Sequence, residues 1–288
     1  MKTRFIINPI SGTGKQKGIE HYISKKFVNY DLYFTEKSGH AKILAKQAVC
    51  DNINLLVVIG GDGTINECLE PLVNTKTILF MIPCGSGNGF AKHLAINSNI
   101  KKALISIKDS STKLVDIGYV NNKPFINVAG IGFDAHISKL FSKSIKRGLL
   151  SYILVILKEI FYNANEYQIE FKNIKKKVNA YMISFANSSQ FGNNAKISPL
   201  AKINDGLIDF VIVKKFPKWK LLFFAYKLLN GTIHNSNFVE IIRCNKMKIN
   251  SNNYLVHLDG EPHKFNKQIE ITILKKSIKV LNPNGKKK

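Results

Sequence analysis

A glycine-rich turn between an apolar run and a helix-like segment constrains this chain more than any other feature. Leu55–Ile59 are consecutive aliphatic residues, typical of a buried parallel strand, and Gly60-Gly61-Asp62-Gly63-Thr64 follows directly. The next residues, from Ile65, read as the first turns of a helix. Glycines at such a turn let backbone N–H groups approach a phosphate at the positive end of the helix dipole.

The aspartate in this turn needs a separate explanation, because its charge repels a phosphate. Asp62 makes sense if it holds a divalent cation that bridges to the phosphate. The alternative is a plain turn in which Thr64 caps the helix and Asp62 forms the turn locally. With three glycines around one aspartate in this context, we favour a Mg²⁺-nucleotide site and phosphoryl transfer.

Two further predicted strands end in loops of small residues. Arg4–Ile7 leads into Asn8-Pro9-Ile10-Ser11-Gly12-Thr13-Gly14-Lys15, and Ile78–Ile82 leads into Pro83-Cys84-Gly85-Ser86-Gly87-Asn88-Gly89. The first loop is not a P-loop, because its glycines are too close together and Gln16 follows Lys15. Open α/β sheets bind ligands at the carboxyl ends of their strands, so three such loops predict one ligand site.

The chain is strongly basic, with a net charge of +24. Such a charge attracts an anionic membrane surface or nucleic acid, unless the excess of lysine is only compositional. No nucleic-acid-binding motif is visible, so nucleic acid is not an expected partner. The scattered cysteines form no CxxC pair, which favours a reducing compartment and argues against structural zinc.

No apolar stretch reaches the roughly 18 residues that a membrane-spanning helix needs. The longest, Leu149–Leu157, lies between Arg147 and Lys158 and is expected to form a largely buried helix. The chain starts directly with a strand-like run, so no signal peptide is expected.

The pattern of elements changes near Gly118. Residues 1–118 alternate strand-like and helix-like segments, which predicts a doubly wound α/β domain. Beyond them, strand-like runs with hairpin-type turns dominate and predict an antiparallel β domain. Helices are expected within it at Leu149–Phe161 and Trp219–Leu229.

Taken in order, the motifs resemble those of the diacylglycerol kinase catalytic family, which includes bacterial lipid kinases, sphingosine kinases and ceramide kinases. GGDGT alone is shared with phosphofructokinases and NAD kinases, so the full series carries the resemblance. The matching segments are NPxSGxGK from Asn8, GGDGTINE from Gly60, PCGSGNGFAKHL from Pro83, Leu114–Gly118, Phe125–Asp134, Asn204–Asp209 and Asp259–Glu261.

This resemblance implies two domains with the active site in the cleft between them. A three-layer, doubly wound α/β nucleotide-binding domain would comprise residues 1–118 and a returning C-terminal segment, 277–288. An antiparallel β-sandwich at 119–276 would bind the lipid. The implied activity is that of an ATP-dependent, Mg²⁺-dependent lipid kinase that phosphorylates the hydroxyl of diacylglycerol, a sphingoid base or another lipid alcohol.

The resemblance also assigns roles to residues. Asp62 would organise the catalytic Mg²⁺, and Glu261 would be the general base; the alternative for Glu261 is a solvated residue after an ordinary Asp259-Gly260 turn. Lys15 either pairs with phosphates or is a solvated lysine. The nucleotide site would comprise Asn8, Pro9, Ile10, Ser11, Gly12, Thr35, Gly60, Gly61, Asp62, Gly63, Thr64, Ile65, Asn66, Gly85, Ser86 and Asn88.

A second, structural Mg²⁺ is implied at Asn204-Asp205-Gly206-Leu207. Its ligands would be Asp205 and the main-chain carbonyls of Lys202 and Leu207, since oxygen-only coordination suits Mg²⁺. The same residues also read as an ordinary turn that opens a strand.

One departure from the family pattern bears on the acceptor. Bacterial members commonly carry an aspartate after the asparagine of the third motif, whereas this chain has Gly89 there. The Gly-Ser-Gly-Asn form is closer to that of sphingosine and ceramide kinases. Asp116 and Asp134 are therefore the carboxylates expected to contact the substrate.

Two alternatives stay open: an NAD kinase-like phosphotransferase with a soluble substrate, and a non-catalytic basic module that binds lipid or nucleic acid. The Asp-Gly-Glu and Gly-Ser-Gly-Asn motifs favour the lipid kinase, and Asp62 with Glu261 argues against a non-catalytic module. The expected partners are the lipid substrate and an anionic membrane surface, with the protein cytoplasmic and peripheral on the inner face. A homodimer is left open.

Overall fold

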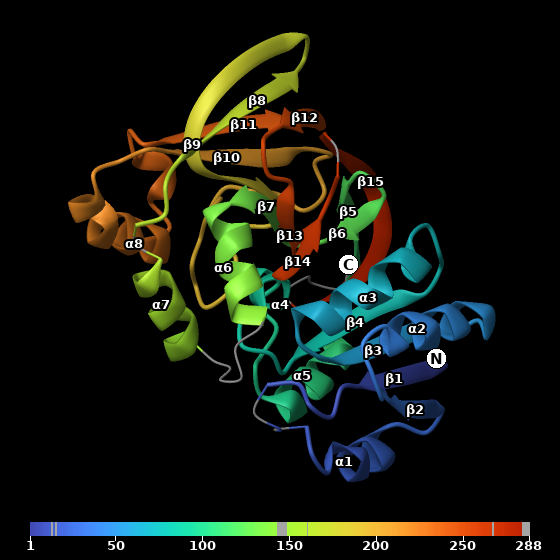
Figure 1. Cartoon of the computed structure of the whole chain (residues 1–288). Coiled ribbons are helices and arrows are strands. Elements are labelled where there is room, and N and C mark those ends of the chain that lie inside the picture. The colour runs from blue at the N-terminus through green and yellow to red at the C-terminus, as the bar shows by residue number, and fades with distance from the viewer. Residues whose placement is uncertain (13, 15, 143–148, 160, 267, 284–288) are drawn as a thin grey trace. The chain divides into compact units, whose positions relative to one another are not determined.

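The computed structural model describes residues 1–283 except 13, 15, 143–148, 160 and 267, and it leaves the side chains of 149–153 undescribed (Figure 1). The chain forms two compact units. One comprises Met1–Val115 with Lys276–Lys288, and the other comprises Asp116–Lys275.

The first unit is built on a parallel sheet with the strand order β2-β1-β3-β4-β15. Its strands are β1 (Thr3–Ile7), β2 (Tyr30–Phe34), β3 (Leu55–Gly60), β4 (Ile78–Pro83) and the last part of β15 (Ile269–Asn282). Its helices are α1 (Ile19–Lys26), α2 (His40–Cys50), α3 (Asp62–Leu72), α4 (Gly89–His93) and α5 (Ile100–Ser106), followed by a 3-10 turn at Ile107–Asp109.

Helices cover both faces of this sheet, so its central strands are continuous apolar runs. Every residue of β3 is buried. Figure 1 shows α2 and α3 over one face and α1 with α5 over the other, as right-handed crossovers require for this strand order. The register aligns Ile7 of β1, Ile59 of β3 and Ile82 of β4 in one row, so the loops after these strands leave the sheet side by side.

The second unit is dominated by antiparallel pairing. The long strand β9 pairs with β7, β8 and β10, while β13 joins β7 to β14, and β12 joins β8 to the first part of β15. The strands are β5 (Ser111–Val120), which crosses the boundary between the units, β6 (Lys123–Phe125), β7 (Val128–Gly132), β8 (Asn165–Phe171), β9 (Ile174–Ala186), β10 (Ile208–Lys214), β11 (Val239–Cys244), β12 (Lys246–Asn250), β13 (Leu255–Leu258) and β14 (Glu261–Lys264).

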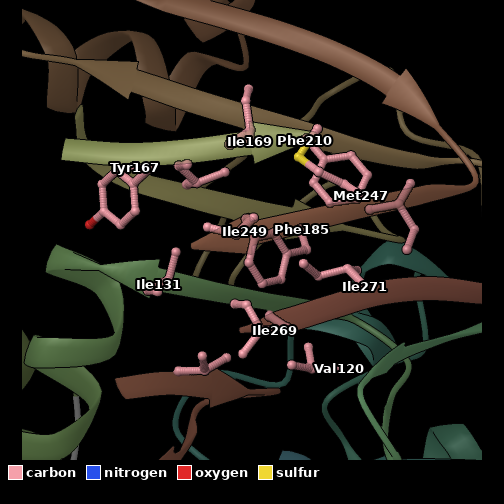
Figure 2. Close-up of a cluster of buried hydrophobic side chains, with 14 of the residues drawn as sticks. Val120, Ile131, Tyr167, Ile169, Phe185, Phe210, Met247, Ile249, Ile269 and Ile271 are labelled. Atoms are coloured by element: carbon pink, nitrogen blue, oxygen red, sulfur yellow. The ribbon is translucent and has the colours of Figure 1, made fainter. Parts of the chain in front are cut away.

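The core of the second unit lies between strands that are far apart in sequence. Side chains from β7, β8, β9, β10, β12 and β15 meet there, as Figure 2 shows for Ile131, Ile169, Phe185, Phe210 and Ile249 among others. The rings of Phe185 and Phe210 lie 5.6 Å apart. Buried residues alternate with less buried ones on β8 and β12, as in a sheet with one buried face, whereas β10 is buried on both faces because Val211 and Val213 belong to a second buried cluster.

The helices of this unit lie outside that core. They are α6 (Phe133–Ser142), α7 (Leu149–Lys158) and α8 (Leu221–Asn230), with 3-10 turns η2 (Lys218–Lys220) and η3 (Ile233–Asn235). Helix α6 packs on β7, β13 and β14, which positions the residues discussed below. None of the described helices is long and apolar enough to cross a bilayer.

The predicted order of an α/β unit followed by an antiparallel β unit is confirmed. One expectation is wrong: α7 is not largely buried where its side chains are described, because Leu154 and Leu157 are both at least half exposed. Helix α6 was not expected, since it follows directly from the glycine-rich end of β7.

Candidate active site

The three predicted loops meet in the first unit because glycines let their backbones touch. Gly12 has a φ of +60°, and a Cβ placed there would lie 1.7 Å from the carbonyl oxygen of Cys84. A Cβ at Gly85 would lie 2.8 Å from Cα of Gly61. Side chains at these positions would therefore push the first and second loops away from the third.

Polar side chains tie the first loop to the second. Asn8 Nδ2 donates a hydrogen bond of 2.9 Å to Thr64 Oγ1, and Asn8 Oδ1 accepts one of 3.1 Å from the Ile10 N–H. Gln16 is almost fully buried, and its amide donates to the carbonyls of Asn8 and Ser11 at 2.7 and 3.0 Å. Gln16 occupies the position after the lysine, where a P-loop has Ser or Thr, and here it shapes the loop.

Asp62 ties the second loop to the third. It is the first residue of α3, and its carboxylate accepts backbone N–H bonds from Asn88 at 2.7 Å and from Gly89 at 3.1 Å. Asn88 has a left-handed backbone (φ +54°), and its side chain exchanges hydrogen bonds with the backbone N–H and carbonyl of Gly85 at 2.9 and 2.6 Å. Asp62 and Asn88 therefore set the shape of the third loop, whatever else they contact.

The second loop leads directly into the N-terminus of α3. Its N-cap residue is Gly61, which has no side chain to bond the first-turn N–H groups. Those groups and the helix dipole favour negative charge at this position. Lys92 on α4 adds a cation nearby: burial lowers its pKa, and the negative charge of Asp62 opposes that change.

The remaining predicted nucleotide residues lie along the same edge of the sheet. Thr35 follows β2 and donates its N–H to the carbonyl of Ile7 at 2.9 Å. Thr64 and Ile65 are buried, Ile10 is exposed, and Lys15 lies outside the described residues. The other predicted nucleotide residues lie on the three loops that leave the sheet side by side or on the start of α3: Asn8, Pro9, Ser11, Gly12, Gly60, Gly61, Gly63, Asn66, Gly85, Ser86 and Asn88.

Glu261 lies in the second unit, at the start of β14, after a turn whose two residues both have positive φ. Asp259 has φ +50° and Gly260 +92°, the conformation of a tight hairpin turn. The Asp259 carboxylate accepts N–H bonds from Ile126 at 3.0 Å and Asn127 at 2.8 Å. An ordinary solvated turn has no such anchor.

A second set of contacts holds the same turn from the side of α6. Ser138 donates its hydroxyl to the carbonyl of Gly260, and Nδ1 of His257 accepts the Gly260 N–H at 3.3 Å. With Nδ1 accepting, Nε2 is the ring nitrogen that faces Asp134, 3.3 Å from its Oδ2. Asp134 also accepts the hydroxyl of Ser184 at 2.9 Å.

These contacts hold the backbone of the turn but do not involve the side chain of Glu261. Residue Glu261 is exposed, and its carboxylate makes no hydrogen bond or ion pair with any residue that the structure describes. Asp134, by contrast, is buried and hydrogen-bonded on both carboxylate oxygens. Glu261 therefore has a fixed backbone and a carboxylate that is available to a ligand. Asp134 contacts the turn through His257.

His263, two residues further along β14, accepts a hydrogen bond from the ammonium group of Lys123 at 3.1 Å. Burial, then the charges of Lys123 and His257, lower the pKa of His263 to about 4. His263 is thus neutral at physiological pH and adds no positive charge beside Glu261.

Asp116 lies next to the predicted structural metal loop. It is fully buried, and its Oδ2 accepts the N–H of Gly206 at 2.6 Å. In that loop Asp205 Oδ1 accepts the N–H of Leu207 at 3.1 Å, and Asp205 Oδ2 lies 3.5 Å from Nη2 of Arg243. Lys202 is exposed at the start of the loop.

One carboxylate of this loop lies beside an arginine. Asp205 has a cationic partner in Arg243, whose Nε also pairs with Asp209 at 2.7 Å. Among the described residues, no three His, Cys, Asp or Glu side chains are grouped so that they could hold a metal, but the predicted ligands here are one carboxylate and two main-chain carbonyls. The metal role of Lys202, Asp205 and Leu207 therefore stays a prediction, and no chemical step below depends on it.

Sequence reasoning missed several residues that the structure brings to these sites. Gln16, Lys92, Ser138, His257 and Arg243 each contact a predicted residue or a predicted loop. Two of them have a local signal: Lys92 lies four residues after Asn88 in the third motif, and His257 alternates with Asp259, Glu261 and His263, a pattern that suggests a metal site but is discounted because Gly260 and Pro262 break the strand pattern. The others come from positions with no local pattern that distinguishes them.

Comparison with known proteins identifies both units. Residues 2–120 match the family model of the diacylglycerol kinase catalytic domain, and residues 127–281 match the YegS C-terminal domain, described as NAD kinase beta sandwich-like. The chain therefore combines a diacylglycerol kinase catalytic domain with a C-terminal β-sandwich, which confirms the predicted fold class.

Relatives agree over most of the chain. A diacylglycerol kinase of Bacillus subtilis (strain 168) is 31% identical over 90% of this chain and 89% of its own length. A probable lipid kinase, YegS-like, of Chromohalobacter salexigens is 30% identical over 79% of this chain and 76% of its own. The chain belongs to the diacylglycerol kinase family of lipid kinases, as the resemblance indicated.

Solved structures agree with the fold. A crystal structure of a diacylglycerol kinase from Bacillus anthracis str. Sterne superposes with a TM-score of 0.73, covering 97% of this chain and 96% of the other at 21% identity. Another structure from that organism reaches 0.80 at 23% identity with the same coverage.

Proposed function

We propose that this protein transfers the γ-phosphate of ATP to the hydroxyl group of a membrane lipid. The observation that carries the proposal is the convergence of three glycine-rich strand ends at the N-terminus of α3. Membership of a lipid kinase family supports a lipid as the acceptor.

The first unit would bind the nucleotide. Backbone N–H groups at the start of α3 would bind phosphate oxygens at the positive end of the helix dipole. Gly12, Gly61 and Gly85 let the three loops pack closely around this position. Lys92 would add positive charge beside the phosphates.

Mg²⁺ would neutralise phosphate charge when bound with the nucleotide. Asp62 fits the role of its protein ligand, because its carboxylate lies at the start of α3 and is held beside the third loop by the N–H groups of Asn88 and Gly89. Those two hydrogen bonds also fix the carboxylate at the centre of the three loops.

The second unit would supply the base. As the lipid oxygen forms its bond to the γ-phosphorus, the bond from that phosphorus to the bridging oxygen of ADP breaks, and the hydroxyl proton passes to Glu261. The anchored turn at Asp259-Gly260 supports this role, because a base must be held in position to be effective. Asp134 and His257 would position that turn.

The acceptor class is diacylglycerol, a sphingoid base or another lipid alcohol. We also propose that the protein acts at an anionic membrane surface on the cytoplasmic side. The net charge of +24 supports this location.

One assay with parallel acceptors tests the proposal. The purified protein is incubated with γ-labelled ATP and Mg²⁺ and is offered diacylglycerol, sphingosine, a total lipid extract or NAD. Label is expected in the lipid phase and not on NAD. Label on NAD alone would support the NAD kinase-like alternative. Lipid binding without label on any acceptor would support a non-catalytic module.

A further inference from the structure

Helix α8 and the turn before it carry an apolar surface that the fold leaves uncovered. Five side chains along it are more than half exposed: Trp219, Leu222, Phe223, Tyr226 and Leu229. Leu222, Tyr226 and Leu229 are spaced by three or four residues, and Phe223 lies three residues before Tyr226, so these four share one side of the helix. We call the set of five the α8 apolar stripe.

The opposite side of α8 is already packed against the protein. Phe224 and Leu228 contact a buried cluster that includes Val128, Val211 and Val213. The rings of Phe216 and Phe224 stack with centroids 5.1 Å apart. The exposed stripe is therefore not needed to attach α8 to its own unit, and a typical water-facing helix side would be polar.

Lysines surround the stripe. Residues 214–230 contain five lysines, Lys214, Lys215, Lys218, Lys220 and Lys227, and no acidic residue. The ammonium groups of Lys220 and Lys227 lie over the rings of Trp219 and Phe223, at 5.0 and 4.9 Å from the ring centres. The nearby carboxylate of Glu240 is taken up by Lys176 and Lys214, at 2.6 and 2.9 Å.

The apolar surface continues from α8 toward α7. Lys218 Nζ lies 4.3 Å from the ring centre of Phe161, which is itself three-quarters exposed and follows α7. Leu154 and Leu157 on α7 are also exposed. Figure 1 shows α7 and α8 next to each other, in the same unit.

We propose that the α8 apolar stripe inserts into the surface of an anionic lipid bilayer and docks the enzyme there. The chemistry of the stripe fits an interface, where Trp and Tyr lie at headgroup level, aliphatic side chains reach the acyl chains, and lysines extend to lipid phosphates. Docking on a second copy of this chain is disfavoured, since a two-fold contact would bring the same lysines together. The inference rests on the proposed membrane-lipid substrate.

Trp219 is the single tryptophan of the chain and reports directly on this surface. The full-length protein is titrated with vesicles of phosphatidylcholine containing phosphatidylglycerol, and with vesicles of phosphatidylcholine alone. Tryptophan emission is expected to shift to shorter wavelength and to resist acrylamide quenching with the anionic vesicles. Unchanged emission from protein that sediments with those vesicles would overturn the proposal.

Paired variants separate insertion from general charge attraction. Leu222→Ser with Tyr226→Ser removes apolar surface that is already exposed, so folding should be intact, and vesicle affinity should fall at least about tenfold. Ile174→Ser is the matched control, since Ile174 is half exposed in the same unit and is followed by three lysines. Equal loss in both variants would contradict docking through α8.

Two further measurements distinguish the remaining outcomes. Phosphorylation of a short-chain lipid without vesicles should be unchanged in the Leu222/Tyr226 double variant, since neither residue belongs to the proposed reaction. If vesicle binding behaves as expected but no lipid is phosphorylated, the proposed kinase fails and the docking surface stands. If the double variant changes only the sedimentation coefficient of the free protein, the stripe is an interface between copies.

Discussion

Asp62 illustrates how one residue can serve structure and chemistry together. Its carboxylate accepts two backbone N–H bonds from the third loop, at Asn88 and Gly89, and it is also the proposed Mg²⁺ ligand. Gly89 contributes only its backbone N–H to this contact. The family aspartate that is missing there is therefore not needed to hold the third loop in this chain.

The Asp62→Asn variant separates these two roles. If Asp62 holds the cation, the variant should lose at least about 100-fold in turnover, the usual effect of removing a principal electrostatic element. Its affinity for ATP should also no longer increase with Mg²⁺. Calorimetry with and without Mg²⁺ measures this. A variant that binds ATP more weakly but with an unchanged Mg²⁺ dependence would mean that Asp62 only shapes the loop.

Glu261→Gln tests the proposed base. The substitution keeps the shape of the side chain but cannot accept a proton, so single-turnover lipid phosphorylation should fall by roughly 10²–10⁴-fold. ATP affinity should be unchanged, since the proposed nucleotide residues belong to the other unit. Glu166→Gln, at another exposed glutamate of the second unit, is the control. Turnover within a few-fold of wild type would make Glu261 a turn residue and move the search to Asp134.

The half-buried His93 predicts that the protein becomes less stable to unfolding as the pH falls. Burial, then the charge of Lys113, lower its pKa from 6.5 to about 4. Between these two values the unfolded chain binds a proton that the native protein does not, so stability is complete above about pH 6.5 and decreases as the pH falls toward 4. Through His93, the free energy of unfolding of wild type should decrease by up to about 2 kcal/mol between pH 7 and 5. His93→Gln should not show this part of the decrease.

Urea unfolding at both pH values measures this difference. His21→Gln, at an exposed histidine of α1, is the matched control. An equal pH dependence in wild type and His93→Gln would show that other groups cause the acid sensitivity.

At the scale of elements, the ligand site of the first unit depends on how closely three loops approach one another. The parallel register of β1, β3 and β4 brings their ends level, and glycines then permit backbone contact. The contact of Gly12 with the Cys84 carbonyl is the tightest of these, and it joins segments about 70 positions apart in the chain. The loops therefore act as one structure rather than as three separate turns.

Gly12→Ala should disrupt this arrangement. The new methyl group would overlap the Cys84 carbonyl, so the first and third loops must separate, and ATP affinity should fall at least about tenfold. Gly18→Ala is the control, because Gly18 has a similar φ of +72° but nothing within 4 Å of its Cβ position. Both variants carry the strain of a left-handed backbone, roughly 1–2 kcal/mol, and only the first adds the overlap. Equal ATP affinity in the two variants would contradict the prediction.

At the scale of the whole molecule, the net charge of +24 should govern attraction to membranes. Binding to anionic vesicles should weaken steeply as salt rises above physiological strength, where the Debye length is about 8 Å. Sedimentation with anionic and neutral vesicles over a salt series measures this. Binding that is equal for both vesicle types would mean that the charge reflects composition alone.

The α8 apolar stripe modifies that expectation. Charge attracts the protein to the surface, whereas insertion of apolar side chains is insensitive to screening. A residual affinity at high salt that disappears in the Leu222/Tyr226 double variant would therefore be consistent with both contributions. The lysines next to the stripe would contribute to the part of the vesicle affinity that depends on salt.

Local patterns in the sequence were enough to determine the fold class and the three loops. The aliphatic runs that end in GGDGT and in the loops from Asn8 and Pro83 predict strands, turns and a shared edge, because burial and backbone freedom are properties of the residues themselves. The order of these motifs also indicated the family that the comparisons identify.

Tertiary structure alone decided which side chains meet and which stay exposed. The hydrogen bond from the Asn88 N–H to Asp62, the anchoring of the Glu261 turn by Asp259 and His257, and the exposure of Leu154 and Leu222 have no local signal. Residues far apart in sequence contact one another only where the packing of strands and helices places them. An apolar helix face has the same sequence pattern whether the protein core or another surface covers it.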